Sequence, residues 1–396
     1  MSKVILHIDL NAFFVRCEEI ENPSLIGKPV IIGHQGRAGV VSTCSYEARK
    51  YGISSGMPTF KAVRLCKDVI IIHGHYELYH KKSREFFNFV KRYTPIIEQA
   101  SVDECFVDFT SVLKDIKDPI SFIKDMQNKL YEETGLMCSI GVAPTKFLAK
   151  MASDMKKPMG ITIIRRKDAK KILSPLPIKD FFGIGKKTAP KLEAMGIKTI
   201  GDLIKLIDSN DAQIKDLFGK MYYVIKDWVN GYGNDVVEVE PNDPKSLGHS
   251  TTLSHNTTDL EELKDYVRML SKEVSDEVKK TGKVGYSVQL VLKDKEFKVT
   301  NRSKKLSKPT NDFATIYQEA TNLLEKNLSD KEIRLVGVTL QDLIDPHDIV
   351  EQLSIFDNFD EMKEKYSTQT LINELNRKMK KAIFKTAADE LKEKRR

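Results

Sequence analysis

Three carboxylates in two short stretches could hold divalent cations. Asp9 follows the apolar run 4–8, and Asp103 and Glu104 lie within the strand-like run 96–108. Carboxylate oxygens are the hard ligands that Mg2+ prefers. Two such ions about 3.5–4 Å apart can activate an attacking hydroxyl and stabilise a triphosphate. The pattern therefore indicates phosphoryl transfer, although a single acidic residue at a strand end is more often a solvated turn residue.

The stretches that carry these residues alternate between strand and helix patterns up to about residue 165. We expect strands at 4–9, 29–33 and 137–142, and helices at 13–21, 119–134 and from 144 to 157. This alternation is typical of an α/β sheet domain. Adjacent strand residues point to opposite faces, so Asp103 and Glu104 can serve one site only where the chain bends, bulges or turns.

The remainder of the chain divides into two further regions. Short helical patterns to about residue 232 predict a small helical domain, and the Gly-, Pro- and Asn-rich stretch 230–244 is typical of a linker. A second, smaller α/β domain follows, with expected helices at 260–278 and 313–327 and strands at 284–292, 297–300 and 333–340.

Composition places the chain among globular proteins of more than one domain. It has 396 residues, of which 41% are hydrophobic and 30% charged, and no run approaches the length of a membrane span. Its N-terminus lacks a signal-peptide pattern, so we expect a cytoplasmic protein. The five cysteines form no Cys-x-x-Cys pair, which argues against a disulfide framework and a zinc site.

Two glycine- or lysine-rich segments suggest contact with a phosphate backbone. Gly183, Gly185, Lys186 and Lys187 fit the turn of a helix-hairpin-helix, where glycines allow close approach, helix N–H groups donate to a phosphate and lysines add charge. A second cluster has small polar residues between its basic ones, and the alternative for it is a solvated loop. It comprises Arg302, Lys304, Lys305 and Lys308.

These motifs, taken in order, resemble the Y-family translesion DNA polymerases, and most closely the bacterial DNA polymerase IV branch. The resemblance rests on Asp9 with Phe13-Phe14, on the stretches 45–53 and 101–104, and on 139–150. It covers the chain to about residue 340. It implies a multidomain α/β protein of the right-hand polymerase type, with palm, fingers, a helical thumb and an α/β little finger.

The resemblance also implies domain boundaries. The palm would comprise 1–10 and 75–165, the fingers 11–74, the thumb with its helix-hairpin-helix 166–233, a linker 234–241, the little finger 242–345 and a tail 346–396.

The family's functional residues map onto this sequence one by one. Asp9, Asp103 and Glu104 would be catalytic and hold two Mg2+ ions, with help from the Leu10 carbonyl. Asn11 stands where many relatives carry a second Asp, and we expect little loss from that change. The nucleotide triphosphate and sugar would contact six residues, with Phe14 as the steric gate against a ribose 2′-OH: Phe13, Phe14, Thr43, Tyr46, Arg49 and Lys157. Val40, Ser42 and Gly56 would face the templating base.

The tail contains a short motif, Gln352-Leu353-Ser354-Ile355-Phe356, that resembles the peptide with which bacterial polymerases dock on the β sliding clamp. Gln352 would form a hydrogen bond, and Leu353, Ile355 and Phe356 would supply the apolar contacts. Such tethering would raise the local concentration of the enzyme on DNA. A helical pattern at 371–383 has no assigned role.

The resemblance implies a monomeric DNA-directed DNA polymerase that extends a primer 3′-OH with dNTPs on a primer-template. Synthesis would be low-fidelity, without proofreading, and mutagenic, and would serve DNA replication and repair past damage. Three alternatives stay open. They are a palm-type nucleotide cyclase, a polymerase V-type subunit that depends on partners, and a non-catalytic relative that binds DNA or the clamp.

Overall fold

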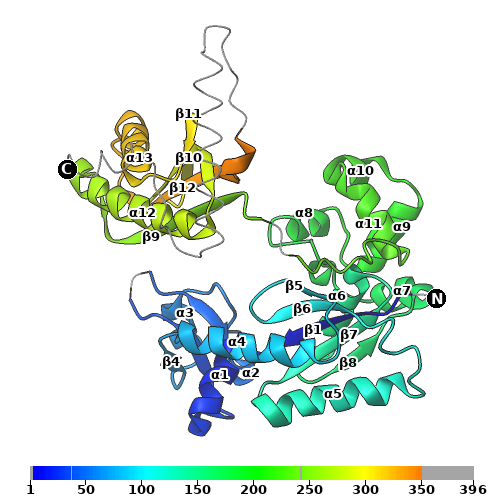
Figure 1. Ribbon diagram of the computed structural model, residues 1–396. Coiled ribbons are helices and arrows are strands. Elements are labelled where there is room, and N and C mark those ends of the chain that lie inside the picture. The colour runs from blue at the N-terminus through cyan, green and yellow to red at the C-terminus, as the bar shows by residue number, and fades with distance from the viewer. Residues whose placement is uncertain (1–2, 37, 241–242, 350–396) are drawn as a thin grey trace. The chain divides into compact units, whose positions relative to one another are not determined.

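The computed structural model describes residues 3–36, 38–240 and 243–349 (Figure 1). The chain forms two compact units, Met1–Asp243 and Pro244–Arg396. Within the described residues, no helix is long and apolar enough to cross a membrane. The clamp-like motif and the helical pattern at 371–383 lie outside the described residues.

A five-stranded sheet with the order β5-β6-β1-β7-β8 organises the first unit. Strand β1 is buried along its length and pairs antiparallel with both β6 and β7, whereas β7 and β8 are parallel. The strands are β1 (Ile5–Leu10), β5 (Ile97–Gln99), β6 (Glu104–Asp108), β7 (Cys138–Ala143) and β8 (Ile161–Ile163).

Helices cover both faces of this sheet (Figure 1). Leu6, Ile8 and Leu10 of β1 belong to a core shared with helices α1 (Phe13–Glu21), α4 (Tyr76–Lys91) and α5 (Pro119–Thr134). His7 and Asp9 point the other way, toward α6 (Lys146–Met155). Because strand side chains alternate, β1 contributes apolar residues to one core and polar residues to the opposite face.

A smaller sheet with the order β3-β2-β4 follows α1 in the chain. It has its own core, which includes Ile31, Val41 and Ile53. Its elements are β2 (Val30–Gly33), β3 (Val41–Cys44), α2 (Tyr46–Lys50), α3 (Thr59–Leu65) and β4 (Ile70–Ile72).

The helical segment of the first unit shares a core with α6. Phe147 of α6 stacks on Trp228 with ring centroids 4.6 Å apart and planes at 9°. The hairpin glycines lie between the 3-10 helix Ile178–Asp180 and α8. The helices are α7 (Ala169–Leu173), α8 (Ala189–Ala194), α9 (Ile200–Asp208), α10 (Ala212–Phe218) and α11 (Met221–Val229).

The second unit is a four-stranded antiparallel sheet with the order β11-β10-β12-β9. Two helices pack on it through a separate apolar core (Figure 1). The elements are β9 (Ser246–Thr257), α12 (Leu260–Thr281), β10 (Val284–Asp294), β11 (Val299–Thr310), α13 (Phe313–Asn327) and β12 (Ile333–Ile344).

The fold confirms the multidomain α/β class and contains elements that were not expected. The strand-like run 96–108 is a hairpin of two strands, β5 and β6, as the family resemblance implies and as the need for a bend or turn near Asp103 and Glu104 required. Seven elements have no counterpart among the expected ones: β3, β4, β8, β9, α2, α3 and α4. The stretch after α11, expected to be a linker, is held by hydrogen bonds to the rest of the first unit. The Asn234 carbonyl accepts from the Lys146 backbone N–H, and the Glu238 backbone N–H donates to the Glu98 carboxylate.

Candidate active site

The hairpin places the acidic residues at one end of the sheet. Asp9 of β1 is directly opposite Glu104 of β6 in the antiparallel register. Asp103 precedes the strand in a bend, where its carboxylate accepts a 2.6 Å hydrogen bond from the Ser101 hydroxyl. Its carbonyl accepts from the backbone N–H of Leu10. Asp103 therefore lies outside the extended strand, where the alternation of adjacent strand residues does not fix the direction of its side chain.

Two lysines from α6 and the loop after it neutralise these carboxylates. Lys150 Nζ lies 3.0 Å from Asp9 Oδ2 and 2.8 Å from Glu104 Oε2. Lys157 Nζ lies 2.8 Å from Asp9 Oδ1 and 2.8 Å from Asp154 Oδ1. Lys157 was expected here from the sequence, whereas Lys150, which ends the family-like stretch 139–150, had no predicted role.

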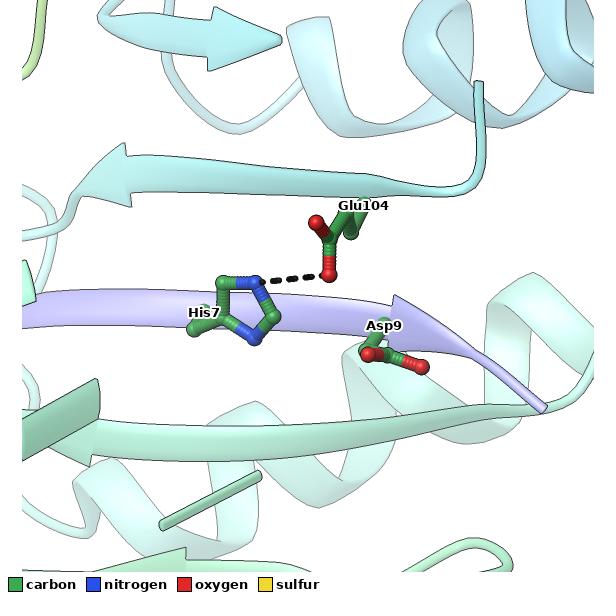
Figure 2. A group of neighbouring side chains, drawn as sticks. All are labelled: His7, Asp9 and Glu104. Atoms are coloured by element: carbon green, nitrogen blue, oxygen red, sulfur yellow. Dashed lines mark ion pairs between the residues drawn. The ribbon is translucent and has the colours of Figure 1, made fainter. Parts of the chain in front are cut away.

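A buried histidine completes the cluster and was missed by the sequence reasoning (Figure 2). The Ser153 hydroxyl donates to the Lys150 carbonyl, so it accepts from His7 Nδ1 at 2.8 Å. Nε2 of the ring then faces Glu104 Oε2 at 3.4 Å, without a hydrogen-bond partner among the described residues. The spacing of His7 and Asp9, two apart on a strand, is the signal that could have identified it.

The charges of the site follow from these contacts. The contact with His7, followed by Lys150, lowers the pKa of Glu104 to about 2 although burial opposes the change. Burial lowers the pKa of His7, whereas the Glu104 and Asp9 carboxylates oppose that change. Burial raises the pKa of Asp103. Burial also opposes the charge of Lys150, but Asp9, Asp154 and Glu104 raise its pKa, so the ammonium persists.

The donor atoms suit a divalent cation. Ligand atoms of His7, Asp9 and Glu104 lie within 4.8 Å of one another, and they form the one such group among the described residues (Figure 2). Two of the three are carboxylates, the ligands that Mg2+ prefers. Asp103 is the neighbour of Glu104 in the chain but lies outside this group. Asn11 is 1% exposed and serves the scaffold, because its Oδ1 accepts from Met159 N and its Nδ2 donates to Ser139.

The residues expected to hold a nucleotide divide into those near the cluster and those in the core. Tyr46 begins α2, and its buried hydroxyl has no hydrogen-bond partner among the described residues. Arg49 lies over the Tyr46 ring, 4.6 Å from its centroid. Burial raises the pKa of Tyr46, and Asp9 adds to that rise, whereas Arg49 and Lys157 oppose it.

The aromatic pair on α1 is unequally exposed. Phe14 is half-buried, whereas Phe13 is 3% exposed and belongs to the sheet core. Thr43 is half-buried on β3. The roles of these three residues in binding a nucleotide stay predictions.

The three residues expected at the templating base lie together at the start of β3. Val40 and Ser42 are exposed, and the Gly56 N–H donates to the carbonyl of Val41 between them. Gly56 has a φ of +81°, and a Cβ there would meet nothing within 4 Å. Their contact with a template stays a prediction.

The two basic segments lie in different units. Gly183 has a φ of +95°, as expected of a hairpin glycine, and Gly185, Lys186 and Lys187 beside it are exposed. The second cluster lies on the edge strand β11 and is exposed, so the solvated-loop alternative is wrong for this segment. Adjacent residues of β11 lie on opposite faces of the sheet, so the strand divides the basic cluster between its two faces. Lys304 is paired with buried Val288, and Lys305 is paired with Ser287. Arg302 Nε donates to Asn327 Oδ1 of α13, and Lys308 lies in the irregular part of the pairing between Lys305 and Thr310.

Comparisons with known proteins agree with this architecture. The sequence profile of the impB/mucB/samB family matches residues 8–154, that of its C-terminal domain matches 244–355, and that of the IMS family HHH motif matches 166–197. The chain is 38% identical over 379 residues to a DNA polymerase IV of Oceanobacillus iheyensis, covering 95% of this chain and 89% of the relative. It is 36% identical over 395 residues to DNA polymerase IV 1 of Bacillus subtilis, covering 99% and 94%.

Solved structures show the same fold. A Y-family chimera of Dbh and Dpo4 superposes with a TM-score of 0.76 at 26% identity, covering 86% of this chain and 99% of the chimera. DinB from Sulfolobus solfataricus superposes with a TM-score of 0.57 at 26% identity and the same coverage. The chain therefore belongs to the impB/mucB/samB family of Y-family translesion DNA polymerases, and is similar there to bacterial DNA polymerase IV.

Proposed function

We propose that this chain performs low-fidelity translesion DNA synthesis without proofreading, as part of DNA damage tolerance. Membership of the family makes it a DNA-directed DNA polymerase. The observation that carries the proposal is the pairing of Asp9 with Glu104 across β1 and β6, beside two lysines from the α6 region. The carboxylates supply negative charge for divalent cations, and the lysines supply positive charge for a triphosphate.

The carboxylates of Asp9, Asp103 and Glu104, with the Leu10 carbonyl, would hold two Mg2+ ions. Bound divalent cations would supply a lowered pKa for the primer 3′-OH and charge neutralisation for the leaving pyrophosphate. The bend at 101–103 lets Asp103 approach the side on which Glu104 lies. His7 Nε2 lies 3.4 Å from Glu104 Oε2, and the ring, which is 0% exposed, excludes water on that side of the carboxylate.

The cationic and hydroxyl groups beside the carboxylates would bind the incoming dNTP. Lys157 and Arg49 supply charge to the triphosphate, and a guanidinium can contact phosphate oxygens in a bidentate way. The hydroxyl of Tyr46, which has no hydrogen-bond partner among the described residues, would donate to a phosphate oxygen. Thr43 adds a hydroxyl on β3. Phe14, with Phe13 behind it, would exclude a ribose 2′-OH.

Template and duplex would lie against the other regions. Val40, Ser42 and Gly56 are small or exposed and would leave room for a damaged templating base. The duplex backbone would contact the thumb hairpin 183–187 and the edge strand β11, through exposed lysines that carry no base specificity. The palm, fingers, thumb and little finger would divide the chain as the resemblance implies.

The tail would bind the enzyme to a partner protein. Gln352, Leu353, Ile355 and Phe356 would dock on a bacterial β sliding clamp and so provide processivity. We further propose, from the family resemblance, that the chain acts as a monomer in the cytoplasm.

Primer extension tests this proposal. An undamaged primer-template with Mg2+ and dNTPs is incubated with the wild type and with a variant carrying Asp103→Ala and Glu104→Ala. We expect product from the wild type alone. Absence of product from a folded wild type that binds DNA, with and without the clamp, would instead favour a partner-dependent polymerase V-type subunit or a non-catalytic relative.

A further inference from the structure

An aromatic side chain supports Phe14 from behind. Tyr79 of α4 stacks on Phe14 with ring centroids 4.3 Å apart and planes at 11°. Tyr76, one turn earlier, contacts both rings edge-on, at 6.1 Å from Phe14 and 5.7 Å from Tyr79. Tyr79 is 2% exposed, whereas Phe14 is half-buried. The position of the Phe14 ring therefore depends on the position of the Tyr79 ring beneath it.

The hydroxyl of Tyr79 is bound to a buried carboxylate. It donates a 2.5 Å hydrogen bond to Glu18 Oε1, and His75 Nδ1 lies 2.9 Å and 3.1 Å from the two Glu18 oxygens. The contacts form a closed pattern between two helices. Phe14 and Glu18 are four residues apart on α1, and His75 and Tyr79 are four apart at the start of α4, so each pair lies on one helix face.

Glu18 is an unusual residue at this position. Only 6% of it is exposed, and its partners among the described contacts are the Tyr79 hydroxyl and the His75 ring rather than a lysine or arginine. A carboxylate is costly to bury unless hydrogen bonds compensate it. Its neighbour Glu19 is also buried but pairs with Arg16 at 3.0 Å, away from the aromatic stack. Burial and the bond to Glu18 raise the pKa of Tyr79, so the hydroxyl keeps its proton.

We propose that Glu18 is a positioning residue for sugar selection, which acts by holding Tyr79 and thereby the plane of the Phe14 ring. The inference rests on the proposed role of Phe14 as the sugar gate. A gate excludes a single oxygen atom only if its ring cannot tilt. A stack fixes the separation of two rings, but it leaves them free to slide and rotate together. The bond from the Tyr79 hydroxyl to Glu18 removes that freedom.

The test compares insertion of dCTP and CTP opposite a template dG, with kcat and KM measured separately. Tyr79→Phe keeps the stacked ring and removes the hydroxyl, and Glu18→Ala removes the acceptor. We expect each change to lower discrimination against CTP by about threefold to tenfold, the range that one aromatic pair can contribute. The change should come from a lower KM and a higher kcat for CTP, with dCTP insertion little altered.

Two further variants make the test specific. Because both substitutions break the same bond, the double variant should discriminate no less than either single variant does. Glu18→Gln keeps an acceptor for the hydroxyl and should restore discrimination close to that of the wild type. Glu19→Gln and Tyr222→Phe are the matched controls, since Tyr222 is also buried and donates to the Ile207 carbonyl in the thumb region. Both controls should leave discrimination unchanged.

Phe14→Ala separates the proposed anchoring role of Glu18 from the proposed gate role of Phe14. If Phe14→Ala admits CTP but Tyr79→Phe and Glu18→Ala discriminate as the wild type does, the anchoring role of Glu18 is wrong while the gate stands. If Phe14→Ala itself leaves discrimination unchanged, the gate is wrong and this inference falls with it. Thermal melting checks that each variant is folded, and Tyr79→Phe alone decides the question if Glu18→Ala does not fold.

Discussion

Replacing Lys150 by Met should destabilise the first unit and make its stability more responsive to divalent cations. The Lys150 ammonium bridges Asp9 and Glu104, and its side chain is 15% exposed against 13% for Asp9 and 26% for Glu104. Methionine is similar in length and apolar, so the change removes the charge and little of the packing. The partly buried carboxylates of Asp9 and Glu104 then lie near each other with one ammonium group fewer beside them. This lowers the free energy of unfolding.

The size of the effect follows from Glu104. Its pKa falls from 4.5 to about 2 in the folded protein, a shift that corresponds to about 3 kcal/mol of stability. His7 accounts for part of that shift and Lys150 for part, and Asp9 retains Lys157 when Lys150 is lost. We therefore expect a loss of about 2 kcal/mol at pH 7. For a unit of this size that loss lowers Tm by roughly 4–8 °C.

The pH dependence has a definite sign. A carboxyl group whose pKa is lowered by folding stabilises the protein above its unfolded pKa of 4.5, and this contribution is lost as the pH falls toward 2. Lys150→Met should reduce the lowering of the pKa, so its stability should fall less steeply over this range. Added Mg2+ should raise Tm more in the variant than in the wild type, because a cation that binds only the folded state stabilises it.

Thermal and urea unfolding at pH 7 and at several values between 5 and 2, with EDTA or Mg2+, measure these effects. Lys156→Met is the matched control, because Lys156 is exposed near the end of the same helix and no described carboxylate pairs with it. A loss below about 0.5 kcal/mol at pH 7, the usual range of surface substitutions, would refute the electrostatic argument. So would an unchanged pH profile.

Three further predictions concern substrates. Arg49→Lys should raise the KM for dNTP almost as much as Arg49→Ala does, because an ammonium cannot contact phosphate in the bidentate way of a guanidinium; steady-state kinetics with a control at exposed Lys50 measure this. Replacing Lys304 and Lys305 by Ala should weaken DNA binding uniformly across sequences and reduce the salt slope of log Kobs by about 2; an unchanged slope in fluorescence anisotropy would exclude β11 as a backbone contact. Replacing Leu353 and Phe356 by Ala should leave extension on a short primer unchanged and abolish stimulation by a β sliding clamp, and equal stimulation of both proteins would contradict the clamp role.

Helix limits could be predicted where local signals are strong. The ends of α5 agree with the expected 119–134, because Asp118 caps its first turn, Pro119 begins it and Gly135 ends it at a φ of +73°. The limits of α1 and α13 were also predicted, in these cases from the helical pattern of their residues. Strand β9 was missed because only Leu253 and Thr257 of its twelve residues are buried, so it lacks the apolar alternation of a half-buried strand.

The carboxylates of the site could be predicted from sequence, but the groups around them could not. Asp9, Asp103 and Glu104 lie in motifs with a recognisable order, whereas Lys150 reaches Asp9 across 141 residues and Glu104 across 46. His7 looked like part of an apolar run because its sequence neighbours, Leu6 and Ile8, are apolar. Such contacts depend on how α6 packs on β1, which is a property of tertiary structure rather than of any local pattern.

Single-turnover insertion of one nucleotide tests the central claim most directly. The wild type and Asp9→Asn are each bound to a primer-template and mixed with Mg2+ and each of the four dNTPs, after DNA binding has been shown to be equal. We predict that the wild type inserts chiefly the complementary nucleotide and that Asp9→Asn is slower by about a hundredfold or more, as expected when one electrostatic group is removed from an active site. Equal rates in the two proteins, or insertion that ignores the template, would contradict the assignment.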